Sequence, residues 1–382
     1  MSYSATVYSG VGIGLVETQE RAGVSTALLG PIGAAALLAG FFGELLLSPF
    51  ADRGKARMLL LMSVFAAGLG ATLLGLAESI WSLVLGRILV NLGLGTVVPL
   101  TYGTLARNNK ENRARILAMA SGFQYFFHAA GAFGVAAAID ALGTKRSFLA
   151  LGAVGVSLVP IVFRGQWVQP QPVADNKPPL FAFGLLRSRR LQGALLLAIA
   201  FTLPVGINNA LWDRYVTDTV QGSALEPNFT NSLTYVLWTM PYVLLTGLGG
   251  RLAERIRGRS KVWLVHLPIV LTSVLYGMAV GPISLLGTSA LDGALQGLLW
   301  PAVMLLVVDS VPEDRSTAAQ SLIFASGSLA TLLVAFVAPA IYQAHGARGA
   351  YLSVGVAMMM VGAVARAFRP KSDLVEAGVT GE

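Results

Sequence analysis

A short charged motif occurs twice in this chain, about 202 residues apart, each time directly after a long apolar run. The first copy is Ser48–Arg57 and the second is Gly250–Arg259. The same offset relates further pairs of identical residues, namely Gly95 and Gly297, Pro99 and Pro301, Glu111 and Glu313, Arg113 and Arg315, Arg146 and Arg348, and Arg164 and Arg366. Similarity at one fixed spacing over most of a chain indicates an internal duplication. The sequence therefore predicts two copies of one half-protein.

The composition places both copies in a membrane. Hydrophobic residues make up 55% of the chain and charged residues only 12%, and the mean hydropathy is +0.68. Soluble domains are about one-quarter charged, so this chain lacks the polar residues needed to cover a globular surface. The absence of cysteine excludes disulfides and thiolate metal sites. The net charge of +8 reflects basic loops between apolar runs and does not indicate a nucleic-acid partner.

Apolar stretches of about 20 residues, long enough to cross a bilayer, recur along the whole chain. We expect eleven of them, at Ser25–Leu47, Met58–Leu76, Trp81–Leu105, Ile116–Leu142, Phe148–Phe163, Leu191–Trp212, Leu233–Leu248, Val262–Val280, Ile283–Val308, Ala318–Tyr342 and Ala350–Phe368. A twelfth is implied at the start, because Leu191–Trp212 needs a counterpart in the first half. Only residues 1–16 remain for it, and they begin with a polar run. The first helix is therefore expected to be shortened or, as we prefer, to lack its start.

Basic residues predict the orientation, because cytoplasmic loops of membrane proteins carry an excess of Lys and Arg. If alternate loops are assigned to the cytoplasm, beginning with the loop of Asp52, they and the tail hold 21 of the 27 basic residues. Both termini are then cytoplasmic if the first helix is complete, and the expected location is the plasma membrane.

The longest polar connection, residues 164–190, contains several prolines that prevent a continuous helix. We interpret it as a cytoplasmic linker. The predicted domains are a six-helix bundle at 1–163 with an incomplete first helix, the linker, a second six-helix bundle at 191–368, and a cytoplasmic tail at 369–382.

The charged motif resembles a signature of the major facilitator superfamily of secondary transporters, G-x-L-A-D-R-x-G-R-R. Asp52, Arg53 and Arg57 fit this signature, although Ser48 and Ala56 depart from it. The stretch Gly250–Arg255 fits the weaker copy in the second half, with one residue inserted before Gly258 and Arg259. The resemblance covers nearly the whole chain. It implies an all-α membrane fold of two six-helix bundles related by a pseudo-two-fold axis, and transport by alternating access.

Two other stretches bear on the branch of the family. Arg87 matches the start of a signature of the fourth helix, where Asn91 occupies a position that is often Gly. The fifth-helix motif of drug:proton antiporters, G-x-x-x-G-P-x-x-G-G, has only a degraded counterpart around Gly131 and Gly134, and no sugar-porter motif is found. The resemblance is closest to the twelve-helix drug:proton antiporter branch.

The duplicated motif predicts an inner gate of ion pairs that close the two bundles on the cytoplasmic side. Ion pairs at a bilayer edge are partly desolvated. Each is therefore expected to contribute more stabilisation than the ~0–1 kcal/mol of a solvent-exposed pair. Asp52 is expected beside Arg53, Arg57 and Arg113. The alternative is that these residues only orient the protein. The candidates are Asp52, Arg53, Arg57, Glu111, Arg113, Glu254, Arg255, Arg259, Glu313 and Arg315.

Ionisable residues within apolar spans are costly, at about 2.5–3.5 kcal/mol on insertion scales, and therefore suggest function. The candidates for proton coupling are Asp292, Arg87, Glu44 and His128. Asp292 is expected to lead, with Arg87 of the other half facing it, unless it is a structural hydrogen-bonding group or binds a substrate amine. Glu44 is expected on the same helix face as Asp52, as a second protonation site or an extension of the gate. His128 is either a relay or a packing residue.

Uncharged polar and aromatic residues in the spans are candidates for substrate contacts, and helix packing is the alternative for each. They are Asn91, Gln124, Tyr125, Asn208, Asn209, Trp238, Gln296 and Trp300. Pro204 precedes the asparagine pair and is expected to break its helix, which would free backbone groups for a ligand.

These features favour a monomeric transporter of a small organic molecule, most simply a proton-coupled exporter of drug-like or amphipathic compounds. Uptake of a metabolite by proton symport or facilitated diffusion is the alternative. A receptor or scaffold that does not transport is possible on the same fold. An intramembrane enzyme is disfavoured, because the three His residues lie in separate segments and no catalytic motif occurs. No cofactor or metal is expected, and a proton gradient is the expected energy source.

Overall fold

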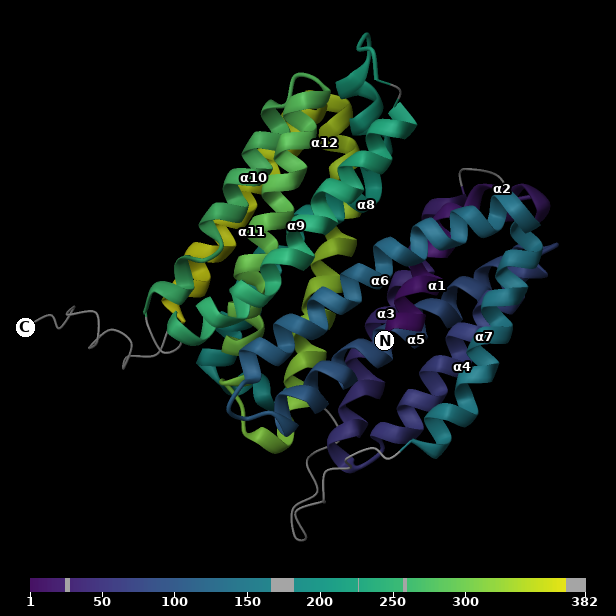
Figure 1. The fold of residues 1–382 in the computed structure, drawn as a ribbon. Helices are drawn as coiled ribbons and strands as arrows, with labels where there is room; N and C mark the ends of the chain where they lie inside the picture. Colours follow the sequence, from purple (N-terminus) through teal and green to yellow (C-terminus); the bar gives the residue numbers. More distant parts are fainter. Residues whose placement is uncertain (25–27, 166–181, 226, 257–259, 369–382) are drawn as a thin grey trace, which may run out of the picture. The chain divides into compact units, whose positions relative to one another are not determined.

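The computed structural model describes residues 1–382 except 25–27, 166–181, 226, 257–259 and 369–382, and the regular structure it describes is entirely helical (Figure 1). The first half contains α1 (Ser2–Ile13), α2 (Leu15–Arg21), α3 (Leu29–Phe42), the π-helix η2 (Gly43–Leu47), the 3₁₀-helix η3 (Ser48–Arg53), α4 (Ala56–Gly75), α5 (Ile80–Asn108), α6 (Arg113–Leu142) and α7 (Thr144–Arg164).

The second half contains η4 (Ala182–Arg187), α8 (Arg189–Val220), α9 (Pro227–Ile256), η5 (Ser260–Leu264), α10 (Leu267–Met278), α11 (Pro282–Val308), η6 (Glu313–Arg315) and α12 (Ser316–Ala367). The label α12 covers two helices in succession, because Gly346 between them has a φ of 66° and is not helical. Only glycine adopts such a conformation readily. The predicted spans Ala318–Tyr342 and Ala350–Phe368 correspond to these two helices.

The chain divides into two compact units. Unit 1 comprises Met1–Arg107, Phe123–Ala182 and Glu313–Ala325, and unit 2 comprises Asn108–Gly122, Phe183–Pro312 and Ser326–Glu382. Each unit therefore takes one short segment from the other half of the sequence. That segment is the start of α12 in unit 1 and the start of α6 in unit 2. The predicted bundles 1–163 and 191–368 keep each half of the sequence together and do not include this exchange of the starts of α6 and α12. They stay a prediction.

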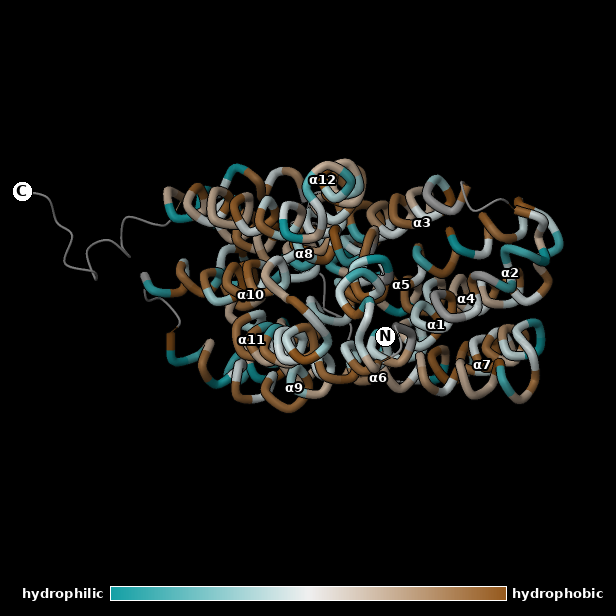
Figure 2. The backbone as a smooth tube through the Cα atoms, turned by 90° about the horizontal axis from the view of Figure 1, so that it is seen from above, coloured by the Kyte–Doolittle hydropathy of each residue, from teal (hydrophilic) through white to brown (hydrophobic). Residues whose placement is uncertain are grey.

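Within the described residues, nine helical stretches are long and apolar enough to cross a membrane, and one of them contains both helices of α12. Hydrophobic residues, brown in Figure 2, recur along α3, α9 and α10. Helix α9 corresponds to the predicted span Leu233–Leu248 but is not among the nine. Its first half carries Thr and Asn residues that lower its hydropathy.

The start of the chain is helical, although it is too polar to be among the nine stretches. Helices α1 and α2 are separated by Gly14, where the ring of Phe148 in α7 lies so close that a Cβ atom would stand 2.6 Å from it. The Tyr3 hydroxyl donates a hydrogen bond to the carbonyl oxygen of Leu151, at 2.8 Å, and Thr144 donates to Glu17. Tyr3, one of the polar residues that made this start unusual for a span, and Glu17 therefore contact α7 within unit 1.

The duplication is repeated in the helix packing. A Cβ atom on Gly95 would overlap the carbonyl oxygen of Gly40, and a Cβ atom on Gly297 would lie 2.6 Å from the carbonyl oxygen of Tyr242. The first contact belongs to unit 1 and the second to unit 2. Because Gly297 follows Gly95 by 202 residues and Tyr242 follows Gly40 by 202, the same helix crossing occurs at equivalent positions in both units.

Replacing Gly297 with Ala should destabilise unit 2, because the backbone of α9 must move away from the added methyl group. Overpacking of this kind costs about 1–3 kcal/mol. Gly287 lies on the same helix with nothing within 4 Å of its Cβ position, so Gly287→Ala is the matched control. It should be neutral, or stabilising by up to about 1 kcal/mol through helix propensity. Unfolding temperatures of both variants in detergent measure the difference, and equal shifts would contradict the close crossing.

Candidate functional site

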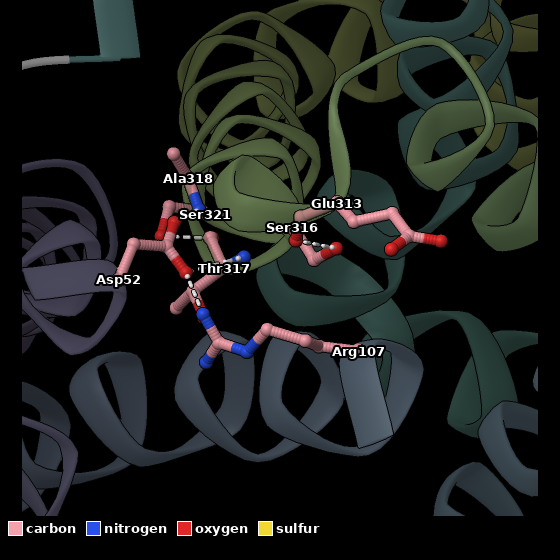
Figure 3. A network of polar contacts seen from close by, with 7 residues as sticks. All are labelled: Asp52, Arg107, Glu313, Ser316, Thr317, Ala318 and Ser321. Atoms are coloured by element: carbon pink, nitrogen blue, oxygen red, sulfur yellow. Dashed lines mark hydrogen bonds and ion pairs between the residues drawn. The ribbon is translucent and has the colours of Figure 1, made fainter. Parts of the chain in front are cut away.

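The carboxylate of Asp52 is buried in a network at the start of α12, entirely within unit 1 (Figure 3). Its side chain is only 2% exposed and forms an ion pair with Arg107, with 3.0 Å between Oδ1 and Nη1. The backbone N–H of Thr317 donates to Oδ1 at 3.2 Å, and that of Ala318 donates to Oδ2 at 2.8 Å. One carboxylate thus connects the end of α5 with the first turn of α12.

The local structure explains this arrangement. The first N–H groups of a helix have no partner within the helix, and its N-terminus attracts negative charge. The hydroxyl of Ser316 donates to the carbonyl oxygen of Glu313 and closes the turn before α12, while the Thr317 and Ala318 N–H groups remain for Asp52. Gly103 permits the approach of α5, because a Cβ atom there would overlap Thr317. Asp52 therefore acts as a tertiary cap of α12.

Asp52 lies near the end of a helical segment that changes from α-helix to other helix types. After α3 the chain forms the π-helix η2 and then the 3₁₀-helix η3. The Ser48 hydroxyl lies at the junction and is within hydrogen-bond distance of the carbonyl oxygens of Gly43 and Thr96, at 3.1 and 3.0 Å. The predicted shared face of Glu44 and Asp52 assumed an uninterrupted α-helix, whereas the chain between them is π- and 3₁₀-helical, and it stays a prediction.

A second ion pair lies in unit 2. Nη1 of Arg113, at the start of α6, lies 3.5 Å from Oδ1 of Asp309, directly after α11, and both side chains are 8% exposed. Asp309 follows Arg107 by 202 residues, but Arg113 does not correspond to Asp52, whose counterpart at this offset is Glu254. The two pairs therefore share one equivalent position, at which the sign of the charge is reversed.

The other predicted gate residues are arranged differently from the expectation. Arg113 pairs with Asp309 within unit 2, and its predicted place beside Asp52 concerns different units and stays a prediction. Arg57 lies over the ring of Phe163, with 4.8 Å from its Cζ to the ring centroid. Arg315 is buried and Arg53 is partly buried, whereas four others are exposed, namely Glu111, Glu254, Arg255 and Glu313. Glu254 and Arg255 form no ion pair within the described residues, and Arg259 lies outside them.

Sequence reasoning did not select Arg107, the start of α12 or Asp309, which form these two networks. A backbone N–H has no sequence signature. Arg107 and Asp309 occupy equivalent positions at the 202-residue offset. A search for identical residues does not find them, because their charges are opposite.

Three of the four proton-coupling candidates gather around Tyr8 within unit 1. Tyr8 interacts electrostatically with both Arg87 and Glu44, and its ring meets the ring of His128 edge-on at 5.7 Å. Nδ1 of His128 is 2.8 Å from the hydroxyl of Ser9. Glu44 and His128 are buried, and Nε of Arg87 has no hydrogen-bond partner within the described residues. The sequence suggested each of these residues separately, but it gave no reason to select Tyr8.

Asp292 lies in unit 2 and accepts hydrogen bonds from neutral donors. Nε1 of Trp238 donates to Oδ2 and Oγ1 of Thr272 donates to Oδ1, both at 2.9 Å. The Trp238 ring stacks on Tyr242 at 5.2 Å. Trp238, a substrate candidate from the sequence, thus holds Asp292 here. The pairing of Asp292 with Arg87 concerns side chains of different units and stays a prediction.

Several other substrate candidates have packing partners. Gln124 accepts a hydrogen bond from Tyr102 at 2.9 Å, and Asn208 accepts one from Tyr351 at 2.9 Å. The remaining candidates are arranged as follows: Asn91 donates to the carbonyl oxygen of Arg87 at 3.0 Å, Tyr125 lies 5.9 Å from His128 between ring centroids, Trp300 lies 5.8 Å from Phe201, Gln296 is partly buried, and the side chain of Asn209 lies outside the described residues.

The predicted break at Pro204 is wrong, because α8 continues through it from Arg189 to Val220. Groups of three or more potential His, Asp or Glu metal ligands do not occur in the described part of the chain.

Solved structures share this fold across nearly the full chain. The Escherichia coli fucose:proton symporter FucP covers 97% of this chain and 96% of its own, with a TM-score of 0.72 and 15% identity. The human organic anion transporter MFSD10 (TETRAN) gives a TM-score of 0.75 at 13% identity, covering 95% of this chain and 96% of its own. At such identities the likeness concerns the fold, which confirms the predicted all-α architecture.

Two curated relatives are transporters. An MFS-type efflux pump of Mycolicibacterium smegmatis is 26% identical over 360 residues, which are 85% of this chain and 80% of the pump. The 4-hydroxybenzoate transporter PcaK of Pseudomonas aeruginosa is 33% identical over 142 residues, which are 37% of this chain and 30% of that protein.

The profile of the Major Facilitator Superfamily matches residues 2–212 and again residues 206–381. These two matches together span nearly the whole chain, and they meet near the middle of the duplication identified from the charged motif. The chain therefore belongs to the Major Facilitator Superfamily and is a multi-pass membrane protein that acts as a secondary transporter and not as an enzyme.

Proposed function

We propose that this transporter is proton-coupled and exports drug-like or amphipathic small molecules. The observation that carries the coupling is the carboxylate of Asp292, which is 5% exposed and has Trp238 and Thr272 as hydrogen-bonding partners. A charged carboxylate at bilayer depth is costly unless it is paired. Within unit 2 these partners are neutral, so the site favours a carboxyl group that alternately takes up and releases a proton.

The cluster of Glu44, Arg87 and His128 around Tyr8 supports a second titratable site in unit 1. Its groups lie close enough for a change of charge on one to alter the others. In this proposal Asp292 leads the coupling, with Arg87 modulating it, and the unit 1 cluster relays or senses the proton.

The proposed direction, export, is supported by how much of the chain each relative matches. The relative described as an efflux pump matches 85% of this chain, whereas PcaK matches 37% of it. Uptake by symport or facilitated diffusion is the second candidate, favoured by the higher identity to PcaK and by the partly buried cation of Arg87, which suits an organic anion.

The networks around Asp52 and Asp309 are proposed to be the latches of alternating access. Asp52, which pairs with Arg107 in the first half of the sequence, accepts a hydrogen bond from Ala318 in the second half. Arg113 in the first half pairs with Asp309 in the second half. Movement of the proposed bundles, 1–163 and 191–368, about the linker 164–190 would have to break them. The basic loops are proposed to face the cytoplasm of a cell whose plasma membrane holds the protein as a monomer.

The test compares substrate accumulation with and without a proton gradient. Cells that express the transporter are loaded with a fluorescent amphipathic cation or with radiolabelled 4-hydroxybenzoate, and a protonophore is added. Export predicts that the protonophore raises accumulation of the dye, and symport predicts that it lowers accumulation of the acid. Purified protein in liposomes then excludes effects of other transporters. An absence of flux across a broad panel would favour the receptor or scaffold alternative.

A further inference from the structure

Arg57 belongs to the charged motif but takes no part in the Asp52 network. Its guanidinium lies over the ring of Phe163, near the end of α7. Its Nε atom is buried, and no hydrogen bond or ion pair involves Arg57 within the described residues. A cation over an aromatic face is held in place and keeps its terminal N–H groups for another acceptor. The position of Arg57 is therefore fixed while its two terminal nitrogens keep their hydrogen-bonding capacity.

An apolar groove begins beside this arginine, between α4 and α7 of unit 1. It has a volume of about 550 Å³ and is lined by Leu61, Met62 and Phe65 of α4 and by Val159, Pro160 and Phe163 of α7. Arg57, Leu61 and Phe65 are spaced four residues apart and share one helix face. At 1.5 Å per residue the groove extends roughly 12 Å from the arginine along α4.

Packing between the two helices explains where the groove starts. Further along α4, Gly68 and Gly155 bring the backbones together, since a Cβ atom on Gly68 would lie 3.3 Å from the Cα atom of Gly155. Closer to Arg57 the facing residues of the two helices are larger than glycine, so the backbones do not approach in the same way. Met62, Phe65 and Phe163 are 48%, 53% and 61% exposed. In a membrane protein these side chains face lipid, so the groove must be filled by something apolar.

The charges at its mouth are all positive. Lys55 is exposed and lies two residues before Arg57 in the sequence. Arg164 is exposed and is the last residue of α7. Neither α4 nor α7 contains an Asp or Glu residue. The one carboxylate of the preceding turn, Asp52, is engaged by Arg107 and by α12. An anionic group at the mouth would therefore meet attraction from several cations and no nearby acid on these helices.

We propose that the groove between α4 and α7 is a binding site for an anionic phospholipid, with an acyl chain along Leu61 and Phe65 and the phosphate against Arg57 and Arg164. The combination of an apolar channel and a cationic mouth matches the two ends of that molecule. A neutral lipid would fill the channel without using the cations, and a free phosphate would use the cations without filling the channel. This site is separate from the proposed proton-coupling groups and does not depend on the direction of transport.

Native mass spectrometry of the delipidated full-length protein in detergent tests the headgroup contact. The protein is titrated with equimolar phosphatidylglycerol and phosphatidylcholine of identical acyl chains. Phosphatidylglycerol should bind preferentially, and Arg57→Gln or Arg164→Gln should each lower that preference about fivefold, since a basic residue near the headgroups contributes ~1 kcal/mol. Lys261→Gln removes an exposed cation elsewhere and should change nothing. No preference, or an equal loss in all three variants, would overturn the proposal.

The acyl contact has its own pair of variants. Met62→Trp fills the groove and should reduce phosphatidylglycerol binding, while Met360→Trp adds the same bulk at an exposed position of α12 outside the lining and should not. Glycerol 3-phosphate serves as the soluble probe and should fail to compete. If it competes as well as the lipid, or if Met62→Trp binds normally, the groove is not an acyl site. Arg57→Lys checks folding and should keep part of the preference, because the charge remains.

Discussion

Asp52→Asn should reduce transport at least tenfold while expression stays near that of the unchanged protein. The substitution keeps the size of the side chain and removes its charge. An Asn side chain can accept from only one of the two N–H groups of Thr317 and Ala318, because its amide nitrogen is a donor. Arg107, which is 12% exposed, then lies beside an amide in place of a carboxylate.

The free energy of the Asp52 contacts explains why the substitution should lower the transport rate more than the yield of folded protein. Hydrogen bonds to a charged group contribute about 1.5–3 kcal/mol each, and removal of one partner of a buried pair costs about 3–5 kcal/mol. A loss of 3 kcal/mol from one conformation changes its population relative to the others by more than a hundredfold. The conformation that contains the cap would become rare, and a cycle that must pass through it would slow.

Initial rates of uptake or efflux in proteoliposomes measure the effect at equal protein density. Asp314→Asn is the control, because Asp314 lies three residues before Thr317 and is exposed. It removes the same charge near α12 without touching the cap and should leave rates unchanged. Normal transport by Asp52→Asn would show that the network only anchors this end of unit 1.

Much of this arrangement could be predicted from the sequence because it follows from local patterns. The charged motif, the apolar spans and the 202-residue offset are properties of consecutive residues, and they gave the fold and the importance of Asp52. The identity of its partners depends on which helix ends meet, and apolar periodicity carries no information about that. Arg107 follows the predicted span Trp81–Leu105 and counts in the sequence only as one of the 21 basic residues of the predicted cytoplasmic side. Thr317 contributes a backbone N–H that any residue except proline has.

One error has an equally specific cause. Pro204 lies within a helix that continues through it, so the local rule that proline ends a helix did not hold at this position. The face shared by Glu44 and Asp52 was inferred from 3.6 residues per turn, whereas the chain between them is π- and 3₁₀-helical, a change of winding that the apolar pattern does not reveal. Trp238 was selected as an aromatic substrate contact, and the sequence gave no sign that its indole N–H donates to Asp292.

Asp292→Asn should abolish coupling to the proton gradient and spare the fold. The amide fits the existing hydrogen bonds. Its oxygen can accept from the indole N–H of Trp238, which can only donate, and its nitrogen can donate to the Thr272 hydroxyl, which can reverse its role. The variant therefore keeps its neighbours but cannot carry a proton. For exchange of one proton, a tenfold proton gradient supports about tenfold accumulation, equivalent to about 1.4 kcal/mol.

Proteoliposomes with an imposed pH difference measure this directly. Accumulation should fall from about tenfold to none in Asp292→Asn, while downhill flux of the same substrate persists. Asp218→Asn removes an exposed carboxylate that pairs with Arg214 in the same unit, and it should retain accumulation. If Asp292→Asn still accumulates substrate and Glu44→Gln does not, the proton is carried by the cluster around Tyr8.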